Sequence, residues 1–365
     1  VHTKTFLGAI MEKYLQNIKN SNKDVYLQAK KHLDFLAKPL GSLGELEEIS
    51  AKLCSIYNTL NINVDKKAII VLASDNGVFE EGIASTPQEV TAIQTINILE
   101  NKTGVGVLAK QFNIDIIVCD VGIKCNINHP KLINKKIRNC TSNFAKTEAM
   151  TRQEAIKSIN IGIELVNKAK KDGYKILGIG EMGIANTTTS SAILASVLNL
   201  KDEEIESVVG VGAGLTKDAY NKKVQVIKNA IKKHNPNPKD IVNIIQKVGG
   251  FDIGAMIGVY IGCAYNKIPI VIDGFIAIVA GLCAVKLNEN IKDYMFLSHK
   301  SMEKGYILAQ KELALPSYLD LKMRLGEGSG CPLMFSVIDA SIAIFKNMAT
   351  FDEAKIDTKY LESLK

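Results

Sequence analysis

One glutamate framed by glycines has the residue type and the surroundings that proton transfer requires. Glu327 lies between Gly326 and Gly328, and apolar residues recur on both sides of this segment, from Leu321 to Phe335. Glycines let the backbone approach a ligand closely, and apolar surroundings raise the pKa of a carboxyl group towards the range of a general base. We therefore predict that Glu327 is a general base; a solvated loop glutamate is the alternative interpretation.

A second glycine-framed glutamate, Glu181, lies in the segment Gly-Ile-Gly-Glu-Met-Gly at 178–183. This segment follows a predicted strand and precedes a predicted helix, so it also matches the G-x-G-x-x-G fingerprint of dinucleotide-binding proteins. Two features argue against a dinucleotide: Glu181 would place an acid near a pyrophosphate, and the next predicted strand leads to Gly212 rather than to a ribose-binding acid. An NAD-dependent oxidoreductase remains the alternative function at this point.

A run of hydroxyl-bearing residues follows at 187–191, directly after Asn186, at the start of a predicted helix. The N-terminus of a helix binds phosphate through its backbone N–H groups, whereas an N-cap needs only one such hydroxyl. A second glycine-rich loop, at 210–214, lies about two helical turns before Lys222 and Lys223. This loop predicts a contact with another part of a phosphorylated ligand, or else a tight turn between a strand and a helix.

Two further acids, Asp252 and Asp273, lie next to glycines in predicted turns. Such acids are more often part of Asx-turns than ligand contacts. No two of the five histidines have the spacing of metal ligands, and no cluster of Asp and Glu resembles a magnesium site. We predict that the protein uses neither a metal nor another cofactor.

The elements that must position these residues alternate between short apolar runs and helical periodicity. We predict strands at 67–73, 114–120, 174–179, 208–211, 268–272 and 294–297, and helices at 90–108, 152–171, 188–198 and 217–233. Strands that alternate with helices predict an α/β fold with a mostly parallel sheet flanked by helices. Ligands of such sheets bind beyond the carboxyl ends of the strands, where the glycines and acids described above would gather.

Both ends of the chain are predicted to be helical. Apolar residues recur at helical spacing before residue 64, and the segment that begins near 337 is helical to about 348 and polar afterwards. We predict a small helical domain formed by 1–64 together with about 337–365. The remaining residues, 65–336, form a large α/β catalytic domain.

The composition argues against several classes of partner. The hydrophobic fraction of 47% and the charged fraction of 23% are those of an ordinary globular protein. The net charge is +7, but the lysines are scattered and tryptophan is absent, which argues against nucleic-acid binding. The longest apolar run, 268–285, is interrupted by Asp273, which argues against a membrane span. Seven cysteines without a Cys-x-x-Cys pair indicate reduced thiols in a cytoplasmic protein.

Motifs distributed over most of the chain resemble those of one known family. They lie at 38–44, 74–78, 90–94, 180–188, 247–252, 273–275, 298–299 and 324–330, and they include Lys-Pro-Leu-Gly-Ser-Leu-Gly, Ser-Asp-Asn-Gly-Val and Arg-Leu-Gly-Glu-Gly-Ser-Gly. Together they make the chain similar to the nicotinate-nucleotide:dimethylbenzimidazole phosphoribosyltransferase family, which makes the lower-ligand nucleotide of cobalamin. The resemblance implies a homodimer whose large domain is a Rossmann-like parallel sheet and whose small helical domain joins both chain ends. The alternatives are a heterodimer with a paralogue and a non-catalytic paralogue.

The resemblance also implies roles for individual residues. The family's general base corresponds to Glu327, and a second active-site acid corresponds to Glu181. The substrates would be nicotinate mononucleotide and an aromatic base. The pocket for the incoming base corresponds to Thr86, Gln94, Met182 and Leu325, and the phosphoribosyl side corresponds to Gly183, Asn186, Thr187, Thr188, Gly212, Lys223 and Asp273.

Two residues depart from the pattern of the family. Asn76 stands where family members often have histidine, and Thr86 stands where serine is usual. Thr86 keeps the hydroxyl group and adds a methyl group. Because related enzymes act on benzimidazoles, purines or phenolic compounds, these two residues leave the accepted base open.

Overall fold

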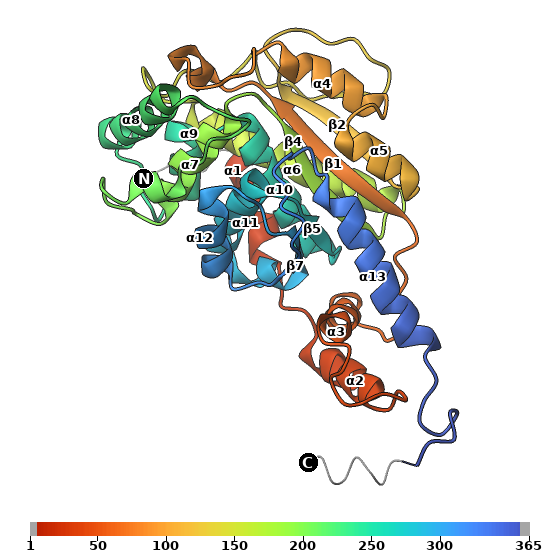
Figure 1. Cartoon of the computed structure of the whole chain (residues 1–365). Coiled ribbons are helices and arrows are strands. Elements are labelled where there is room, and N and C mark those ends of the chain that lie inside the picture. The colour runs from red at the N-terminus through yellow and green to blue at the C-terminus, as the bar shows by residue number, and fades with distance from the viewer. Residues whose placement is uncertain (1–5, 358–365) are drawn as a thin grey trace.

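The computed structural model describes residues 6–357 and has one seven-stranded sheet, in which every pair of neighbouring strands is parallel (Figure 1). The strand order is β3-β2-β1-β4-β5-β6-β7. The strands are β1 (Lys67–Ser74), β2 (Asp115–Gly122), β3 (Ile133–Asn134), β4 (Ile176–Met182), β5 (Ile270–Ile272), β6 (Met295–His299) and β7 (Ser317–Leu319). The order reverses between β1 and β4, which is the point where doubly wound sheets form a ligand-binding crevice.

Helices cover both faces of the sheet, and the predicted α/β class is therefore confirmed. The α-helices are α1 (Phe6–Gln16), α2 (Lys23–Asp34), α3 (Glu45–Tyr57), α4 (Val90–Leu99), α5 (Gly104–Gln111), α6 (Arg152–Lys171), α7 (Asn186–Val197), α8 (Lys217–His234), α9 (Ile241–Val248), α10 (Phe251–Asn266), α11 (Phe275–Leu287), α12 (Lys304–Leu313) and α13 (Gly330–Asn347). On one face, α5 and α13 pack together; on the other, α10 and α11 lie on the sheet and α6 packs on α10. This distribution follows from right-handed connections between parallel strands.

The predicted strands agree with the structure except at one place. The runs at 67–73, 114–120, 174–179, 268–272 and 294–297 correspond to β1, β2, β4, β5 and β6, whereas the strand at 208–211 was wrong. Residues Ile205–Val208 form the 3-10 helix η2, and the segment after it joins no strand. The carbonyl groups of Val208 and Val209 instead accept hydrogen bonds from Ser191 and Tyr220. A short apolar run indicates that a segment is buried, and burial alone does not distinguish a strand from a packed loop.

One predicted helix divides into two. The periodicity at 90–108 predicts a single helix, but α4 ends at Leu99 and α5 begins at Gly104. The side chain of Thr103 accepts a hydrogen bond from the N–H group of Gly106 and thereby caps α5. An N-cap hydroxyl of this kind starts a new helix, and it gives the site described below a second helix N-terminus.

Segments near the two ends of the chain form a helical unit beside the sheet. Helices α2 and α3 pack together, α3 packs on α13, and an antiparallel bridge joins Leu36 to Thr350 (Figure 1). Helix α1 packs on α6 and α10, and α13 runs without a break past residue 337. The division into 1–64 with 337–365 and 65–336 stays a proposal, and its residues 1–5 and 358–365 lie outside the described residues.

Two further observations concern the part of the chain that the structure describes. None of the helices within residues 6–357 is both long and apolar enough to cross a membrane. The seven cysteines are free thiols, and all of them except Cys125 are buried.

Candidate active site

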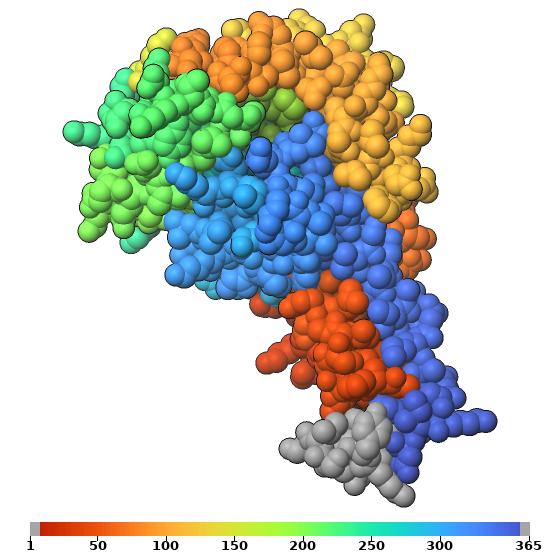
Figure 2. Space-filling view, in the orientation of Figure 1, coloured from red at the N-terminus to blue at the C-terminus, as the bar shows by residue number. Residues whose placement is uncertain are grey.

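A cavity of about 390 Å³ lies at the carboxyl ends of β4, β5 and β6, beneath α4. Figure 2 shows a hollow between segments coloured orange, green and blue, which are far apart in the sequence. The structure brings together every predicted site residue except Thr188 as lining of this cavity: Glu327, Glu181, Thr86, Gln94, Met182, Leu325, Gly183, Asn186, Thr187, Gly212, Lys223 and Asp273.

Glu327 enters the cavity from a turn of unusual backbone conformation. Its φ is 63°, between Gly326 at 87° and Gly328 at 91°. A residue other than glycine adopts this left-handed region only at a cost, so the surrounding structure must hold Glu327 in place. The glutamate is buried, with 5% of its surface exposed, and the alternative of a solvated loop glutamate is therefore wrong.

The N-terminus of α5 holds one oxygen of the Glu327 carboxylate. The N–H group of Val105 donates to Oε2 at 3.3 Å, and Thr103 and the N–H group of Gly104 also stabilise the ionised form. Oε1 accepts a hydrogen bond from Gln94 at 3.4 Å. Burial outweighs these donors and raises the pKa of Glu327, as a general base near neutral pH requires.

Glu181 lies at the end of β4, and its environment favours the neutral carboxylic acid. Burial raises the pKa of Glu181 to about 8, and the charges of Asp252, Asp273 and Glu327 add to the rise, whereas a hydrogen bond from Asn186 opposes it. The amide nitrogen of Asn186 donates to Oε2 of Glu181 over a short distance of 2.5 Å. Two acids therefore face one cavity in different environments, a pattern that suits acid and base roles.

The G-x-G-x-x-G segment is not a phosphate-binding loop. Gly178 and Gly180 lie inside β4, where phosphate-binding glycines would lie in the turn after the strand. A Cβ atom at Gly178 would meet the side chain of Cys331, and one at Gly180 would meet the backbone of Glu327. These glycines make room for the segment that carries Glu327, which removes the main support for the NAD-dependent alternative.

The start of α7 differs from the prediction of an open row of hydroxyl groups. Only Thr187 of the run 187–191 lines the cavity; the other four are completely buried. The N-cap is Ala185, with φ 73°, and the N–H groups of Thr188 and Thr189 donate to its carbonyl oxygen. Helix α7 is buried on all sides, so its hydroxyl groups pack inside the protein, and Thr188 lies behind the cavity rather than in it.

A buried lysine marks the other end of the cavity. Lys223 is 1% exposed and donates to Oγ1 of Thr187 at 3.0 Å and to the carbonyl oxygen of Gly210 at 2.9 Å. Burial lowers the pKa of Lys223 to about 8, and the charge of Glu303 opposes the decrease. Lys222, its neighbour, is exposed. A phosphate group beside Thr187 and Gly212 would meet this cation, whose hydrogen-bond partners are neutral.

Asp273 anchors the turn that carries Glu327. Its two carboxylate oxygens accept hydrogen bonds from the N–H groups of Gly328 at 3.1 Å and Gly330 at 2.7 Å. Burial raises the pKa of Asp273 to about 7, against the effect of these donors. The interpretation as a simple Asx-turn was wrong, because the partners lie 55 and 57 residues away along the chain.

The candidate base pocket lies between α4 and the loop after β4. Gln94 comes from α4, Thr86 precedes that helix, Met182 ends β4, and Leu325 lies at the rim with 58% of its surface exposed. The hydroxyl group of Thr91, also on α4, accepts a hydrogen bond from the N–H group of Ile184 at 3.0 Å. This bond joins the two sides of the pocket from behind.

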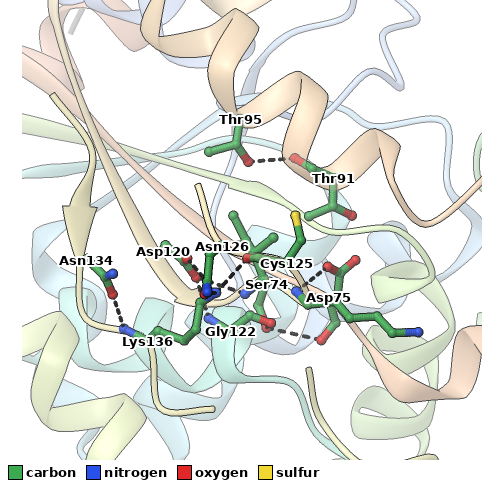
Figure 3. A network of polar contacts seen from close by, with 12 residues as sticks. Ser74, Asp75, Thr91, Thr95, Asp120, Gly122, Cys125, Asn126, Asn134 and Lys136 are labelled. Atoms are coloured by element: carbon green, nitrogen blue, oxygen red, sulfur yellow. Dashed lines mark hydrogen bonds and ion pairs between the residues drawn. The ribbon is translucent and has the colours of Figure 1, made fainter. Parts of the chain in front are cut away.

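A polar network lies near α4, at the ends of β1 and β2 (Figure 3). Figure 3 shows Thr91 on α4 together with Asp75, at the end of β1, and Asp120. Asp75 accepts a hydrogen bond from the N–H group of Lys124 at 2.8 Å, and Asp120 accepts two from Gly122 and Ile123 at 2.9 Å. These buried acids tie the loop after β2 to the end of the sheet.

Several cavity residues were not predicted as site residues. They are charged or polar and come from the end of β6, the segment after it and the segment before Glu327: His299, Ser301, Glu303 and Arg324. Burial lowers the pKa of His299 to about 4, so this histidine is neutral. Thr103 was also missed, although a Thr-Gly pair inside a helical stretch is an N-cap signal. Within residues 6–357, no three His, Cys, Asp or Glu side chains group as metal ligands.

Comparisons with known proteins agree on one family. A family model described as phosphoribosyltransferase matches residues 18–356. The nicotinate-nucleotide–dimethylbenzimidazole phosphoribosyltransferase of Clostridium perfringens (strain 13 / Type A) is 51% identical, over 98% of each chain, and that of Clostridium tetani (strain Massachusetts / E88) is 43% identical, also over 98% of each. The crystal structure of CobT from Thermus thermophilus superposes with a TM-score of 0.86 at 32% identity, over 92% of this chain and 99% of the other.

Proposed function

Because the chain belongs to this phosphoribosyltransferase family, we propose that it moves the phosphoribosyl group of nicotinate mononucleotide to 5,6-dimethylbenzimidazole or a related lower-ligand base. The products are α-ribazole phosphate and nicotinate, and the reaction belongs to cobamide biosynthesis. The observation that carries this proposal is the position of Glu327, a buried carboxylate that lines the cavity and accepts a hydrogen bond from Gln94.

The reaction is a direct displacement at the anomeric carbon of the ribose. A ring nitrogen of the base attacks, nicotinate leaves, and the configuration inverts from β to α. Glu327 takes the N–H proton of the base, or the O–H proton of a phenol, while the new bond forms. General base catalysis of this kind contributes about 10²–10⁴-fold, and the remaining acceleration comes from holding two substrates in attack geometry.

Each end of the cavity suits one of the two substrates. The incoming base lies among Thr86, Gln94, Met182 and Leu325, beside the general base. The phosphate of nicotinate mononucleotide lies near Lys223, Thr187 and Gly212, where a buried ammonium group compensates its charge. Gly183, Asn186 and Asp273 also line the cavity.

Neither alternative has comparable support. A dinucleotide-dependent oxidoreductase would need a glycine turn after the strand, and here the glycines lie within it. A non-catalytic paralogue would have no use for a buried general base held in a left-handed conformation. We further propose a homodimer in the cytoplasm; light scattering of the purified chain distinguishes it from a monomer, and a co-purifying paralogue would indicate a heterodimer.

A product assay tests the proposal. The purified chain receives nicotinate mononucleotide with dimethylbenzimidazole, adenine and phenol in competition, and chromatography follows nicotinate and each nucleoside phosphate. We expect nicotinate release to require an aromatic base and to yield an α-linked product. The proposal fails if no base releases nicotinate, or if NAD binds tightly while nicotinate mononucleotide does not.

A further inference from the structure

Glu181 shares one amide group with a second buried acid. The amide nitrogen of Asn186, at the start of α7, donates to Oε2 of Glu181 in β4 and also to Oδ2 of Asp252 in α10, at 3.1 Å. Glu181 lines the cavity, whereas Asp252 is completely buried and does not. Asp252 therefore acts on the cavity only through Asn186 and through its charge.

Two glycines make room for the carboxylate of Asp252. A Cβ atom at Gly250 would collide with Oδ1, and one at Gly183 would lie only 3.2 Å from Oδ2. Asn76 and the N–H group of Ile253 also stabilise its ionised form. The carbonyl oxygen of the Asn76 side chain in turn accepts a hydrogen bond from Thr189 at 2.9 Å. The acid thus lies behind Asn186, among residues from three parts of the chain, 76, 183–189 and 250–253.

The charges around this pair are all acidic. Glu181 is faced by Asp252 from α10, by Asp273 after β5 and by Glu327 from the turn before α13. Burial raises the pKa of Glu181 to about 8 and that of Asp252 to about 6. Because the two groups interact, their protons leave in sequence. We expect the pair to hold one proton near neutral pH, on Glu181, because its pKa is the higher of the two.

We propose that Asp252 is a positioning residue, whose buried carboxylate lies so close to Glu181, on the amide that both acids share, that Glu181 keeps its proton and donates a hydrogen bond to the phosphoribosyl substrate. A neutral Glu181 also spares Glu327 a further negative charge, which favours the ionised Glu327 that a proton acceptor requires. This role rests on the proposed function, because the donor acts on the sugar that the enzyme transfers.

The substitution Asp252→Asn tests the role because it removes the charge and keeps the shape. The titration of Glu181 is followed in the resting enzyme, without substrate, by carbon NMR of labelled glutamate carboxyl groups, and Glu181→Gln assigns the signal. We expect the midpoint of Glu181 to move about one pH unit lower in Asp252→Asn, since a nearby like charge has been removed.

We also expect Asp252→Asn to change the pH dependence of turnover. Protonated Glu181 is present below its pKa and is lost as the pH rises through it, so a lower pKa moves the alkaline limb of the kcat profile to lower pH. At about pH 8 turnover should fall roughly fivefold, because about half of Glu181 is protonated in the wild type and about a tenth in the variant; at pH 6 turnover should stay close to wild type. KM for nicotinate mononucleotide should change less than kcat.

Asp120→Asn is a matched control. Asp120 is a buried acid, as Asp252 is. It lies in β2, holds the loop after that strand and does not line the cavity. Its loss should lower the melting temperature and leave the alkaline limb in place. An unmoved Glu181 titration in Asp252→Asn, or an equal loss of turnover at every pH, would overturn the proposal.

Wild-type enzyme provides a test that does not depend on the folding of a variant. Labelled aspartate and glutamate signals must show that Asp252 ionises at lower pH than Glu181; the reverse order excludes the proposed role. These titrations need no substrate. A chain that transfers no phosphoribosyl group but shows the expected titrations would therefore refute the proposed function and leave the charge relation between the two acids standing.

Discussion

The two glycine-framed glutamates have similar sequences and opposite backbone conformations. Glu181 belongs to β4, so its flanking residues Gly178 and Gly180 are extended and form part of the sheet. Glu327 belongs to a turn in which three successive residues have positive φ. In the first segment glycine is needed because a side chain would not fit. In the second it is needed because the backbone conformation resists a side chain.

The two segments are also the two sides of one contact. The backbone of Glu327 lies against Gly180, and the side chain of Cys331 lies against Gly178. The proposed general base is therefore positioned by the absence of side chains on a strand that lies about 150 residues earlier in the sequence. A glycine motif read alone does not distinguish ligand approach from packing of this kind.

The largest effect should come from the carboxylate itself. Glu327→Gln keeps the shape of the side chain and removes the proton acceptor, so we expect kcat to fall by about 10²–10⁴-fold. Nicotinate mononucleotide should still bind, as measured by calorimetry. Glu89→Gln, an exposed acid near α4, serves as the control and should keep full turnover. Full activity of Glu327→Gln would remove Glu327 from the mechanism.

The turn should be nearly as sensitive as the carboxylate that it carries. Gly328 has φ 91°, and an added Cβ atom would lie 2.9 Å from the side chain of Ile69. Gly328→Ala should cost roughly 1–3 kcal/mol of stability and should lower kcat by about 10²-fold by displacing Glu327. Gly41→Ala has a comparable positive φ of 69° with open space around it, and it does not line the cavity. It should lose stability alone; equal kcat values for the two variants would contradict this view.

The two glycines of β4, Gly178 and Gly180, contact different residues. Gly180→Ala and Gly178→Ala should each cost roughly 1–3 kcal/mol in thermal unfolding, because both add a methyl group to a packed contact. Only Gly180 touches Glu327, so kcat should fall by roughly tenfold in Gly180→Ala and should change little in Gly178→Ala. If Gly178→Ala were the less active of the two, packing on Glu327 would not explain the need for glycine.

The smallest effect concerns stability and pH. Burial raises the pKa of Glu181 to about 8, above its value in the unfolded chain, so the folded protein retains a proton that the unfolded chain loses. The unfolding free energy should therefore decrease as the pH rises from about 4.5 to 8. Glu181→Gln should weaken this decrease, so that its melting temperature relative to wild type is higher at pH 8 than at pH 5. An identical pH dependence in both proteins would contradict the assignment.

Much of the framework could be predicted from local patterns. The helix predicted at 152–171 is α6, because a capping box of Thr151 and Glu154 starts it and lysines occupy its last turn. Five predicted strands are present because buried apolar runs between helices have few other uses in an α/β chain. The short edge strands β3 and β7, of two and three residues, have too little sequence to give such a pattern.

Local sequence patterns were therefore enough to predict the alternation of strands and helices, the parallel sheet, and the two glutamates that could transfer protons. The positions of Thr188 behind the cavity, of Asp273 against Gly328 and Gly330, and of Gly180 against Glu327 became visible in the folded chain alone. Helices and strands follow from neighbours within a few residues, whereas burial and hydrogen-bond partners at the site join residues from distant parts of the chain. For that reason the residue types were visible before the fold, and their partners were not.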